Sequence, residues 1–404
     1  MLRRKIPSDS PVSIRPVVAS VVLISNALIW YASAFSVLKN LIGETSLVLW
    51  SAHFASAVFS ALAGSKLSGN RAGRTLFIGI WMILGVLSSL LLMFVSAADM
   101  IGVAIISILL GVSFGLGLPA SLALFADSTS VENRAGLGGL VLLLDGLGSF
   151  SIGMFMGDNI VVQALILAAW RIIGLVLFLV INPLEQMSGE RISMSFSAIL
   201  SQRTFILYLV PWTMFSLVNY LSLPVQFKII QDPGLVSLLM TIENVLLGVF
   251  AVVGGLLSDI VGRKRVTIFG FVLLGLGYGA LGIYPRALMS WYFYTFVDGV
   301  AWGIFSVMFI ITIWGDVSYG SPSDKHFAIG GIPFFISNFL RLVVGSQIAE
   351  VVSENAIFSL TALFLFLAVL PLMAAPETLP ERKIKERELR KYIEKAKRIK
   401  QQHS

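Results

Sequence analysis

The sequence of 404 residues has no cysteine, three histidines and few charged side chains. Without cysteine there can be no disulfide, thiolate metal site or cysteine nucleophile. The sequence also lacks an H-E-x-x-H zinc motif and a G-x-x-x-x-G-K-[ST] phosphate loop, so nothing supports metal hydrolysis or an ATP-driven function. We therefore expect neither an enzyme nor a bound cofactor or metal.

Apolar residues dominate the chain instead. They make up 57% of the sequence, and charged residues 13%, about half the usual share of a soluble domain. A bilayer core of about 30 Å takes about 20 apolar residues per helical crossing. Twelve runs are long enough: 14–38, 44–64, 75–96, 101–126, 136–157, 160–182, 204–227, 235–257, 266–284, 289–315, 327–349 and 354–375.

The basic residues lie mainly on one side of these runs. Twelve crossings bring both ends of the chain to one side, and 24 of the 29 lysines and arginines fall there. Because basic loops face the cytoplasm, we expect a multi-pass protein of the cell membrane with both termini cytoplasmic. The net charge of +7 then reflects topology, and we expect no nucleic-acid partner.

The second half of the sequence repeats the first in degraded form. "AGSKLSGNRAGRTLFIG" at 63–79 matches "GGLLSDIVGRKRVTIFG" at 254–270 at an offset of 191. Asp127 and Asp316 end the fourth and tenth spans at an offset of 189. Both of these spans contain runs of small residues, which suit close packing and flexing. Six crossings separate the copies, so the two halves have the same orientation.

These features predict an all-α polytopic membrane protein with twelve transmembrane helices in two pseudo-symmetric six-helix bundles. The predicted parts are a cytoplasmic N-terminus at 1–13, a first bundle at 14–182, a cytoplasmic linker at 183–203, a second bundle at 204–375 and a basic cytoplasmic C-terminal helix at 376–404.

Three motifs together resemble one family. A G-x-x-x-D-x-x-G-R-K-R loop follows the eighth span, a degraded copy follows the second, and P-E-T-L follows the twelfth. In this placement they are similar to the major facilitator superfamily of secondary transporters, over residues 14–379. The resemblance implies the fold of this family and the transport of a small solute by alternating access. We expect a monomer in contact with membrane lipid.

The resemblance also implies a conformational latch after the eighth span. In the family, the motif Asp helps to lock the outward-open state, and the loop after the second span usually carries the better copy. Here Ser68 takes the Asp position of that first copy, and Ile260 follows Asp259 where a basic residue is usual. The predicted latch residues are Gly255, Asp259, Gly262, Arg263, Lys264 and Arg265.

The residues of this loop support a contact without reference to the family. Asp259 is an acceptor for backbone N–H groups at the start of a neighbouring helix, and pseudo-symmetry makes that neighbour the fifth span, at "RAGLGG". The alternative is a turn that only places positive charge on the cytoplasmic side.

Six ionisable residues fall within the spans, where each charge at a helix centre costs roughly 2.5–3.5 kcal/mol. Counted from the span ends, Asp145 is level with Arg171, and Asp298 is level with Arg341, with Glu243 close to the second level. One acid of the second group is therefore left without a fixed counter-charge. The predicted proton-coupling candidates are Asp298, Glu243 and His53. Ion pairs that only hold helices together are the alternative.

Polar residues on shared helix faces are candidates for ion pairing or substrate contact. They are Arg341, Asp145, Arg171, Asn338, Asn26, Trp30 and Asn219. We predict a secondary transporter, coupled to protons, for a sugar, an organic acid or a similar metabolite. Efflux of lipophilic compounds by proton antiport and a non-transporting receptor on the same scaffold remain as alternatives.

Overall fold

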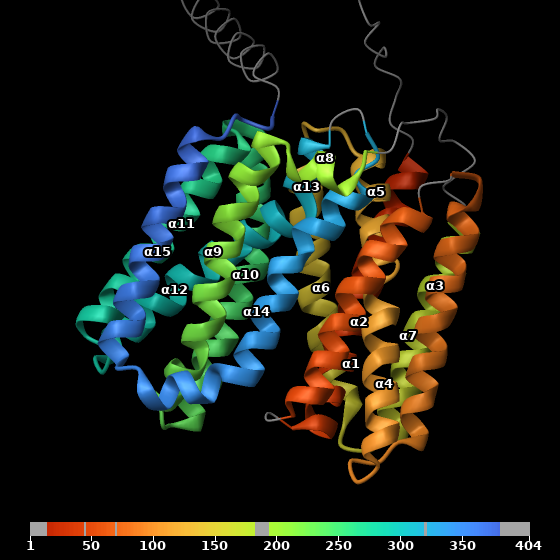
Figure 1. Cartoon of the computed structure of the whole chain (residues 1–404), viewed down its shortest axis with the longest axis horizontal. Coiled ribbons are helices and arrows are strands. Elements are labelled where there is room, and N and C mark those ends of the chain that lie inside the picture. The colour runs from red at the N-terminus through yellow and green to blue at the C-terminus, as the bar shows by residue number, and fades with distance from the viewer. Residues whose placement is uncertain (1–13, 44–45, 69–70, 182–193, 319–320, 380–404) are drawn as a thin grey trace, which may run out of the picture.

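The computed structural model describes residues 14–43, 46–68, 71–181, 194–318 and 321–379. Within them, twelve helical spans are long and apolar enough to cross a membrane (Figure 1). Each overlaps one predicted run, so the predicted number and order of spans are confirmed. The predicted segment at 1–13, much of 183–203 and most of 376–404 lie outside the described residues.

The first six spans form one half of the molecule. Within it, α2 packs on α4, and α7 packs on α1 and α3. The elements are α1 (Ile14–Ile42), α2 (Leu47–Leu67), α3 (Arg71–Leu91) with η1 (Leu92–Phe94), α4 (Met100–Gly115) with α5 (Leu118–Ser128), α6 (Arg134–Met156) and α7 (Ile160–Ile181).

The last six spans form the other half, in which α12 packs on α10, and α15 packs on α9 and α11. The short helix α8 (Phe196–Leu200) precedes them. The remaining elements are α9 (Arg203–Ile229), α10 (Pro233–Val261), α11 (Arg263–Ile283), α12 (Leu288–Phe305) with η3 (Ser306–Thr312) and α13 (Ile313–Val317), α14 (Asp324–Val351) and α15 (Glu354–Ala374).

The two halves lie side by side and meet along two helix pairs, α6 with α10 and α2 with α14 (Figure 1). In the order of the spans these are the fifth with the eighth and the second with the eleventh. The offset between the halves is six spans, so each pair is the pseudo-symmetric counterpart of the other. The contact between the halves therefore follows the repeat found in the sequence.

The fourth span, predicted as one helix over 101–126, is interrupted at Leu116 and Gly117. The indole N–H of Trp81 donates to the carbonyl of Ser113 at 2.5 Å. In an unbroken helix that carbonyl would accept from the amide of residue 117. A Cβ atom on Gly117 would lie 2.0 Å from the Trp81 ring, so glycine makes room for the ring that interrupts the helix.

The tenth span is irregular at the corresponding place. It is α-helical to Phe305, π-helical over Ser306–Thr312 and α-helical again from Ile313. The Thr312 hydroxyl donates to the Val307 carbonyl at 2.7 Å, five residues back. A π segment of this kind marks a place where a helix departs from its regular bonding, and the single helix predicted over 289–315 did not anticipate it.

Glycines let α6 and α10 approach closely. A Cβ atom on Gly139 would lie 2.3 Å from the Ala251 carbonyl oxygen, and one on Gly255 would lie 2.3 Å from that of Ala135. Gly146 lies on the same face of α6, two turns further from α8, and no described atom lies within 4 Å of its Cβ position. The helices touch at the α8 end and leave open space further along.

Replacing Gly139 with alanine tests this close contact. The added methyl group meets the Ala251 carbonyl, and overpacking of this kind costs about 1–3 kcal/mol. We therefore expect the melting temperature of the purified protein in detergent to fall. Gly146→Ala is the matched control on the same face, because alanine favours a helix over glycine by up to about 1 kcal/mol. Equal shifts for both variants would contradict the packing argument.

Candidate functional site

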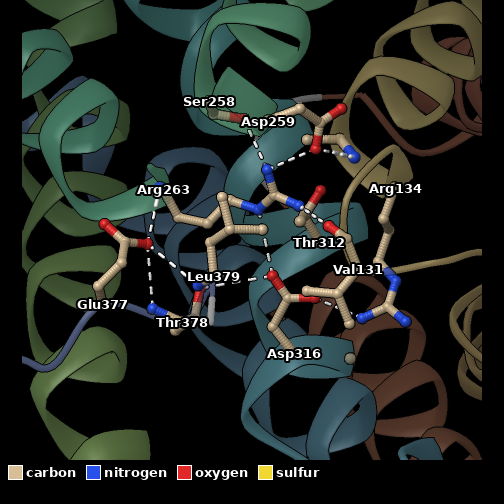
Figure 2. A network of polar contacts seen from close by, with 12 residues as sticks. Val131, Arg134, Ser258, Asp259, Arg263, Thr312, Asp316, Glu377, Thr378 and Leu379 are labelled. Atoms are coloured by element: carbon tan, nitrogen blue, oxygen red, sulfur yellow. Dashed lines mark hydrogen bonds and ion pairs between the residues drawn. The ribbon is translucent and has the colours of Figure 1, made fainter. Parts of the chain in front are cut away.

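Arg263 lies at the centre of a polar network between the halves (Figure 2). It follows Gly262, whose φ of 113° favours glycine. The Arg263 side chain is fully buried. Its guanidinium donates to Asp259 at 2.5 Å, to Asp316 at 3.1 Å and to the Val131 carbonyl at 2.5 Å. A buried guanidinium is tolerated when its N–H groups meet acceptors, and this one meets acceptors from both halves.

Asp259 binds the first turn of α6. Its carboxylate accepts hydrogen bonds from the backbone N–H groups of Ala135 at 3.3 Å and Gly136 at 2.7 Å. Unsatisfied N–H groups and the helix dipole make a first turn favourable for a carboxylate. This is the contact with the fifth span that the sequence predicts. It crosses from one half to the other.

Asp316 links two arginines from different halves. One oxygen accepts from Arg134, the first residue of α6, and the other accepts from Arg263 on α11. Arg134 also donates to the Ala126 carbonyl at 2.6 Å. The sequence marks Asp316 only as a landmark of the repeat, and the role of Arg134 was missed. The available sequence signal was the position of these two residues, since Asp316 ends the tenth span and Arg134 begins the fifth.

Glu377, from the P-E-T-L motif that follows α15, is a further member of the network. Its carboxylate accepts from the backbone N–H groups of Arg263 at 2.8 Å and Lys264 at 3.2 Å, so it caps the start of α11. The Lys264 ammonium donates to the carbonyls of Met373 and Ala375 at 2.7 and 2.8 Å. Arg265, in contrast, is exposed.

The degraded copy of the loop motif in the first half also makes contacts between the halves. Its acidic partner, Asp324, belongs to the second half. The Ser68 hydroxyl donates to Asp324 at 2.6 Å, and the Arg74 guanidinium donates to the same carboxylate at 2.9 Å. Arg74 also pairs with Asp127 at 3.5 Å. Asp324 is the first residue of α14, and the sequence analysis missed it. An acid at the first position of a helix was its signal.

The predicted pairing of Asp145 with Arg171 is wrong. Among the residues that the structure describes, no hydrogen bond or ion pair joins these two side chains. Arg171 is fully buried between the rings of Trp30 and Trp81, at 4.9 and 4.6 Å, and donates to the Asn26 amide oxygen at 2.9 Å. Asp145 is hydrogen-bonded to Ser149 on its own helix. The two residues share a depth, but the Arg171 side chain points towards α1 and α3.

Two substrate candidates of the first span are held within the first half. Asn26 donates to the Trp170 carbonyl at 2.6 Å, and the Trp30 indole donates to the Ser89 hydroxyl at 2.8 Å. Both side chains are buried. Their hydrogen bonds join α1 to α7 and α3, and the structure therefore gives them a packing role.

His53 is fully buried and bonded through both ring nitrogens. Its Nδ1 lies 2.9 Å from the Ser107 carbonyl, and its Nε2 lies 2.9 Å from the Tyr31 hydroxyl. A carbonyl only accepts, so Nδ1 carries the hydrogen, and a neutral ring then accepts from Tyr31 at Nε2. This interhelical bonding is the alternative to a proton-coupling role.

Asp298 and Glu243 form a buried pair of acids in the second half. Asp298 is 2% exposed, its Oδ1 has no hydrogen-bond partner among the described residues, and its neighbour Gly299 packs against the backbone of Glu243. Each lies ten residues from the helix end that points away from α8 (298 − 288 and 243 − 233), so their predicted common depth is confirmed. Two carboxyl groups this close in an apolar bundle repel each other when both are ionised, and a proton on one of them would relieve that repulsion.

A chain of hydrogen bonds leads from this acid pair to α9. Tyr294 lies one turn before Asp298 on α12, and its hydroxyl lies 3.0 Å from the Tyr278 hydroxyl. Tyr278 donates to the Asn219 amide oxygen at 2.9 Å, and Gln226 donates to Tyr294 at 3.0 Å. Asn219, predicted as a substrate contact, thus belongs to an interhelical chain. The two tyrosines were missed, although hydroxyl groups inside apolar spans were a signal.

Arg341 lies at the same depth on α14, ten residues from the helix end (351 − 341). Its guanidinium lies 5.6 Å from the centre of the Tyr220 ring and 3.4 Å from the Asn338 amide oxygen. Asn338 in turn donates to the Phe334 carbonyl at 3.3 Å. The group predicted from depth is therefore divided between two places, with the acids on α10 and α12 and Arg341 between α14 and α9.

Comparisons with known proteins agree on the fold. The family model described as Major Facilitator Superfamily matches residues 192–402. No curated protein matches the chain in sequence. Among solved structures, the proton:xylose symporter XylE, bound to 6-bromo-6-deoxy-D-glucose, is similar with a TM-score of 0.65 and 16% identity, over 90% of this chain and 96% of its own.

Two further solved structures are similar. The human organic anion transporter MFSD10 (TETRAN) has a TM-score of 0.67 and 15% identity, over 90% of this chain and 100% of its own. A bacterial homologue of the iron transporter ferroportin, in the outward-facing state with soaked iron, has a TM-score of 0.69 and 12% identity, over 89% and 98%. At these identities the likeness shows a shared fold.

Asp316→Asn tests the link between the halves. The change keeps the shape but leaves Arg134 and Arg263 without the carboxylate between them, and removing one partner of a buried pair costs about 3–5 kcal/mol. The chain has no native cysteine, so spin labels attach only at Leu67→Cys and Arg265→Cys, one in each half. We expect the distance between the labels to lengthen and broaden.

Asp232→Asn is the matched control for that measurement. Asp232 is exposed and caps the start of α10 by accepting from the Gly234 amide, and asparagine caps a helix equally well. We expect its distance distribution to equal that of the parent. An unchanged distribution in Asp316→Asn would show that this carboxylate does not hold the halves together.

Proposed function

The chain belongs to the major facilitator superfamily, and we propose that it carries a small metabolite across the cell membrane by alternating access, coupled to protons through Asp298 and Glu243. The basic residues support cytoplasmic termini, with bundles over 14–182 and 204–375. The end of the molecule that carries α8 is then the cytoplasmic end. The contacts of Arg263 and Asp324 close this end between the halves.

The latch proposal follows from the kind of contact found there. Asp259 binds backbone N–H groups of α6, and Asp324 binds side chains of the first half. Hydrogen bonds and ion pairs of this type can be exchanged for water when the halves rock apart. Gly255, Gly262 and Lys264 position the loop for this contact. We assign no latch contact to Arg265, because it is exposed.

The single observation that carries proton coupling is the place of two acids, Asp298 and Glu243, at one depth inside the apolar second half, with Asp298 Oδ1 buried and without a partner among the described residues. Two acids that share one proton in an apolar bundle gain or lose a charge when that proton leaves or returns. Tyr294 and Tyr278 connect the acid pair to α9. A change of charge on the pair would thus alter hydrogen bonds on two other helices, α11 and α9, and this gives protonation a route to the position of α9.

The function of one structural relative fits this proposal. The structurally similar XylE is a proton:xylose symporter, so coupling of a metabolite to protons occurs on this fold. His53 has no part in the proposed coupling, because its two nitrogens are already bonded between helices. Efflux of lipophilic compounds and a receptor role gain no comparable observation.

Asp298→Asn and Glu243→Gln test the proton site. The purified protein is placed in liposomes that contain a pH-sensitive dye, and sugars, organic acids and lipophilic cations are added outside. We expect each substitution to reduce solute-dependent proton movement at least ten-fold, since an amide cannot take up or release the proton. Exchange of labelled solute across the membrane should continue, because it needs no net proton transfer.

Asp158→Asn serves as the control, since Asp158 is exposed in the loop between α6 and α7. Its proton movement should equal that of the parent. If Asp298→Asn and Glu243→Gln both moved protons at the parent rate, the acid pair would not be the coupling site. If neither the parent nor any variant moved a solute of the panel, the transport proposal itself would fail.

A further inference from the structure

The helices α6 and α10 come from different halves and pack closely near the α8 end. A Cβ atom on Gly255 would lie 2.3 Å from the Ala135 carbonyl oxygen. One on Gly139 would lie 2.3 Å from the Ala251 carbonyl oxygen. The two contacts are four residues apart on each helix (139 − 135 and 255 − 251). Because the helices run in opposite directions, each step forward along α6 matches an equal step back along α10.

Further from α8 the same faces of the two helices lie apart. A Cβ atom on Gly248 would still lie 3.2 Å from the Leu143 side chain. Beyond this contact, a Cβ atom on Gly146 or Gly153 would meet no described atom within 4 Å. Phe150, between these two glycines on the same face of α6, is 70% exposed. The face that packs against α10 near α8 is therefore open over its outer half.

The matching face of α10 holds a pocket of about 470 Å³, whose wall includes Ser237, Met240, Thr241 and Asn244. Asn244 and Ser237 lie seven and fourteen residues before Ala251 (251 − 244 and 251 − 237). Seven residues make about two helical turns. The pocket therefore lies on the face of α10 that meets α6 nearer to α8.

Extending the register of the contact pairs the open ends of the two helices. Seven residues beyond the contact of Gly139 lie Gly146 on α6 and Asn244 on α10 (146 − 139 and 251 − 244). Seven more lead to Gly153 and Ser237 (153 − 146 and 244 − 237). The middle of the pocket, between Ser237 and Asn244, then lies opposite the middle of the open face of α6.

From this continuity we propose that the α10 pocket receives Phe150 when the ends of the two halves away from α8 come together, with Gly146 against Asn244 and Gly153 against Ser237. The inference rests on the proposed alternating access and names the contact of its second state. Glycines let helix backbones approach closely, and amide and hydroxyl side chains hydrogen-bond between spans.

The chemistry of the pocket favours α6 over lipid as its occupant. Ser237, Thr241 and Asn244 carry hydroxyl and amide groups, and an acyl chain offers these groups no hydrogen bond. The α6 face adds a ring and backbone carbonyls at the matching level. Asn244 is also the chain neighbour of Glu243, so closure of this contact acts on the backbone beside the proposed proton site.

Pairs of cysteines test the register, because the chain has no native cysteine. A disulfide needs the two Cα atoms within about 7 Å of each other. Gly146→Cys with Asn244→Cys, and Gly153→Cys with Ser237→Cys, are made in the parent and in Asp316→Asn, which loosens the α8 end. We expect the cross-linked fraction of the full-length protein, oxidised in liposomes, to rise at least five-fold in Asp316→Asn.

Gly146→Cys with Ser237→Cys is the matched control. It uses one position of each tested pair but places them seven residues out of register, about 10 Å along the axis, so we expect no rise. Equal cross-linking of the control and the matched pairs would show random collision and contradict the register. If neither matched pair rose in Asp316→Asn, the open face of α10 would stay against lipid, and the proposal would be overturned.

Asp324→Asn gives a second loosened background if Asp316→Asn fails to fold, because it removes the acid that binds Ser68 and Arg74. Phe150→Ala tests the pocket itself.

Without the ring to fill the pocket, we expect the rise in cross-linking to be at least halved by Phe150→Ala. Phe155→Ala is its control, since Phe155 is 73% exposed on the opposite face of α6, and the rise should be unchanged. An equal rise with and without the Phe150 ring would show that the pocket does not receive it.

Failure of this pairing is distinct from failure of the transport function, because the cross-linking experiment needs no solute. If solutes moved protons in the liposome experiment while no matched pair cross-linked, transport would stand and the pairing would be overturned. Cross-linking in register without movement of any solute would support the pairing and leave the transport proposal as the one that failed.

Discussion

Few charges can be placed inside an apolar solvent, and each must meet a partner there. Arg263 shows the constraint most clearly, because its buried guanidinium is bonded by carboxylates and a carbonyl drawn from both halves. Taking those acceptors away would leave a bare charge in a medium of low dielectric. The contact between the halves therefore exists where these partners are brought together, and the geometry of α10, α11 and α6 is built around it.

The two copies of the loop motif satisfy the same constraint with opposite arrangements. In the second half the acid, Asp259, belongs to the motif and meets backbone N–H groups of the other half. In the first half the motif offers Ser68 and Arg74, and the acid Asp324 comes from the other half. Pseudo-symmetry thus preserves the place of the contact, while the charges are distributed differently. Both arrangements join the two halves at the same end of the molecule.

Polar groups deeper in the second half make contacts of a different kind, between helices of that half. The acids of α10 and α12 lie at one depth, and the tyrosines beside them are hydrogen-bonded to Asn219. On the neighbouring residue of the same helix, Tyr220 meets Arg341. Adjacent residues of α9, which Pro224 makes easier to bend, thus contact polar groups from two different parts of the second half.

The sequence by itself determined the twelve spans, the repeat, the contact of Asp259 with α6 and the common depth of Asp298, Glu243 and Arg341. These follow from run length and residue count, because every helical residue adds about 1.5 Å of depth. Only the tertiary structure decided that Arg171 lies between two tryptophans, that Asp324 bonds to Ser68 and Arg74 and that Asp298 leaves one buried oxygen without a described partner. Each helical residue also turns the side chain by about 100°, and the rotation of one helix against its neighbours is set by packing. Residue counting gives depth, but it does not give direction, and partners need both.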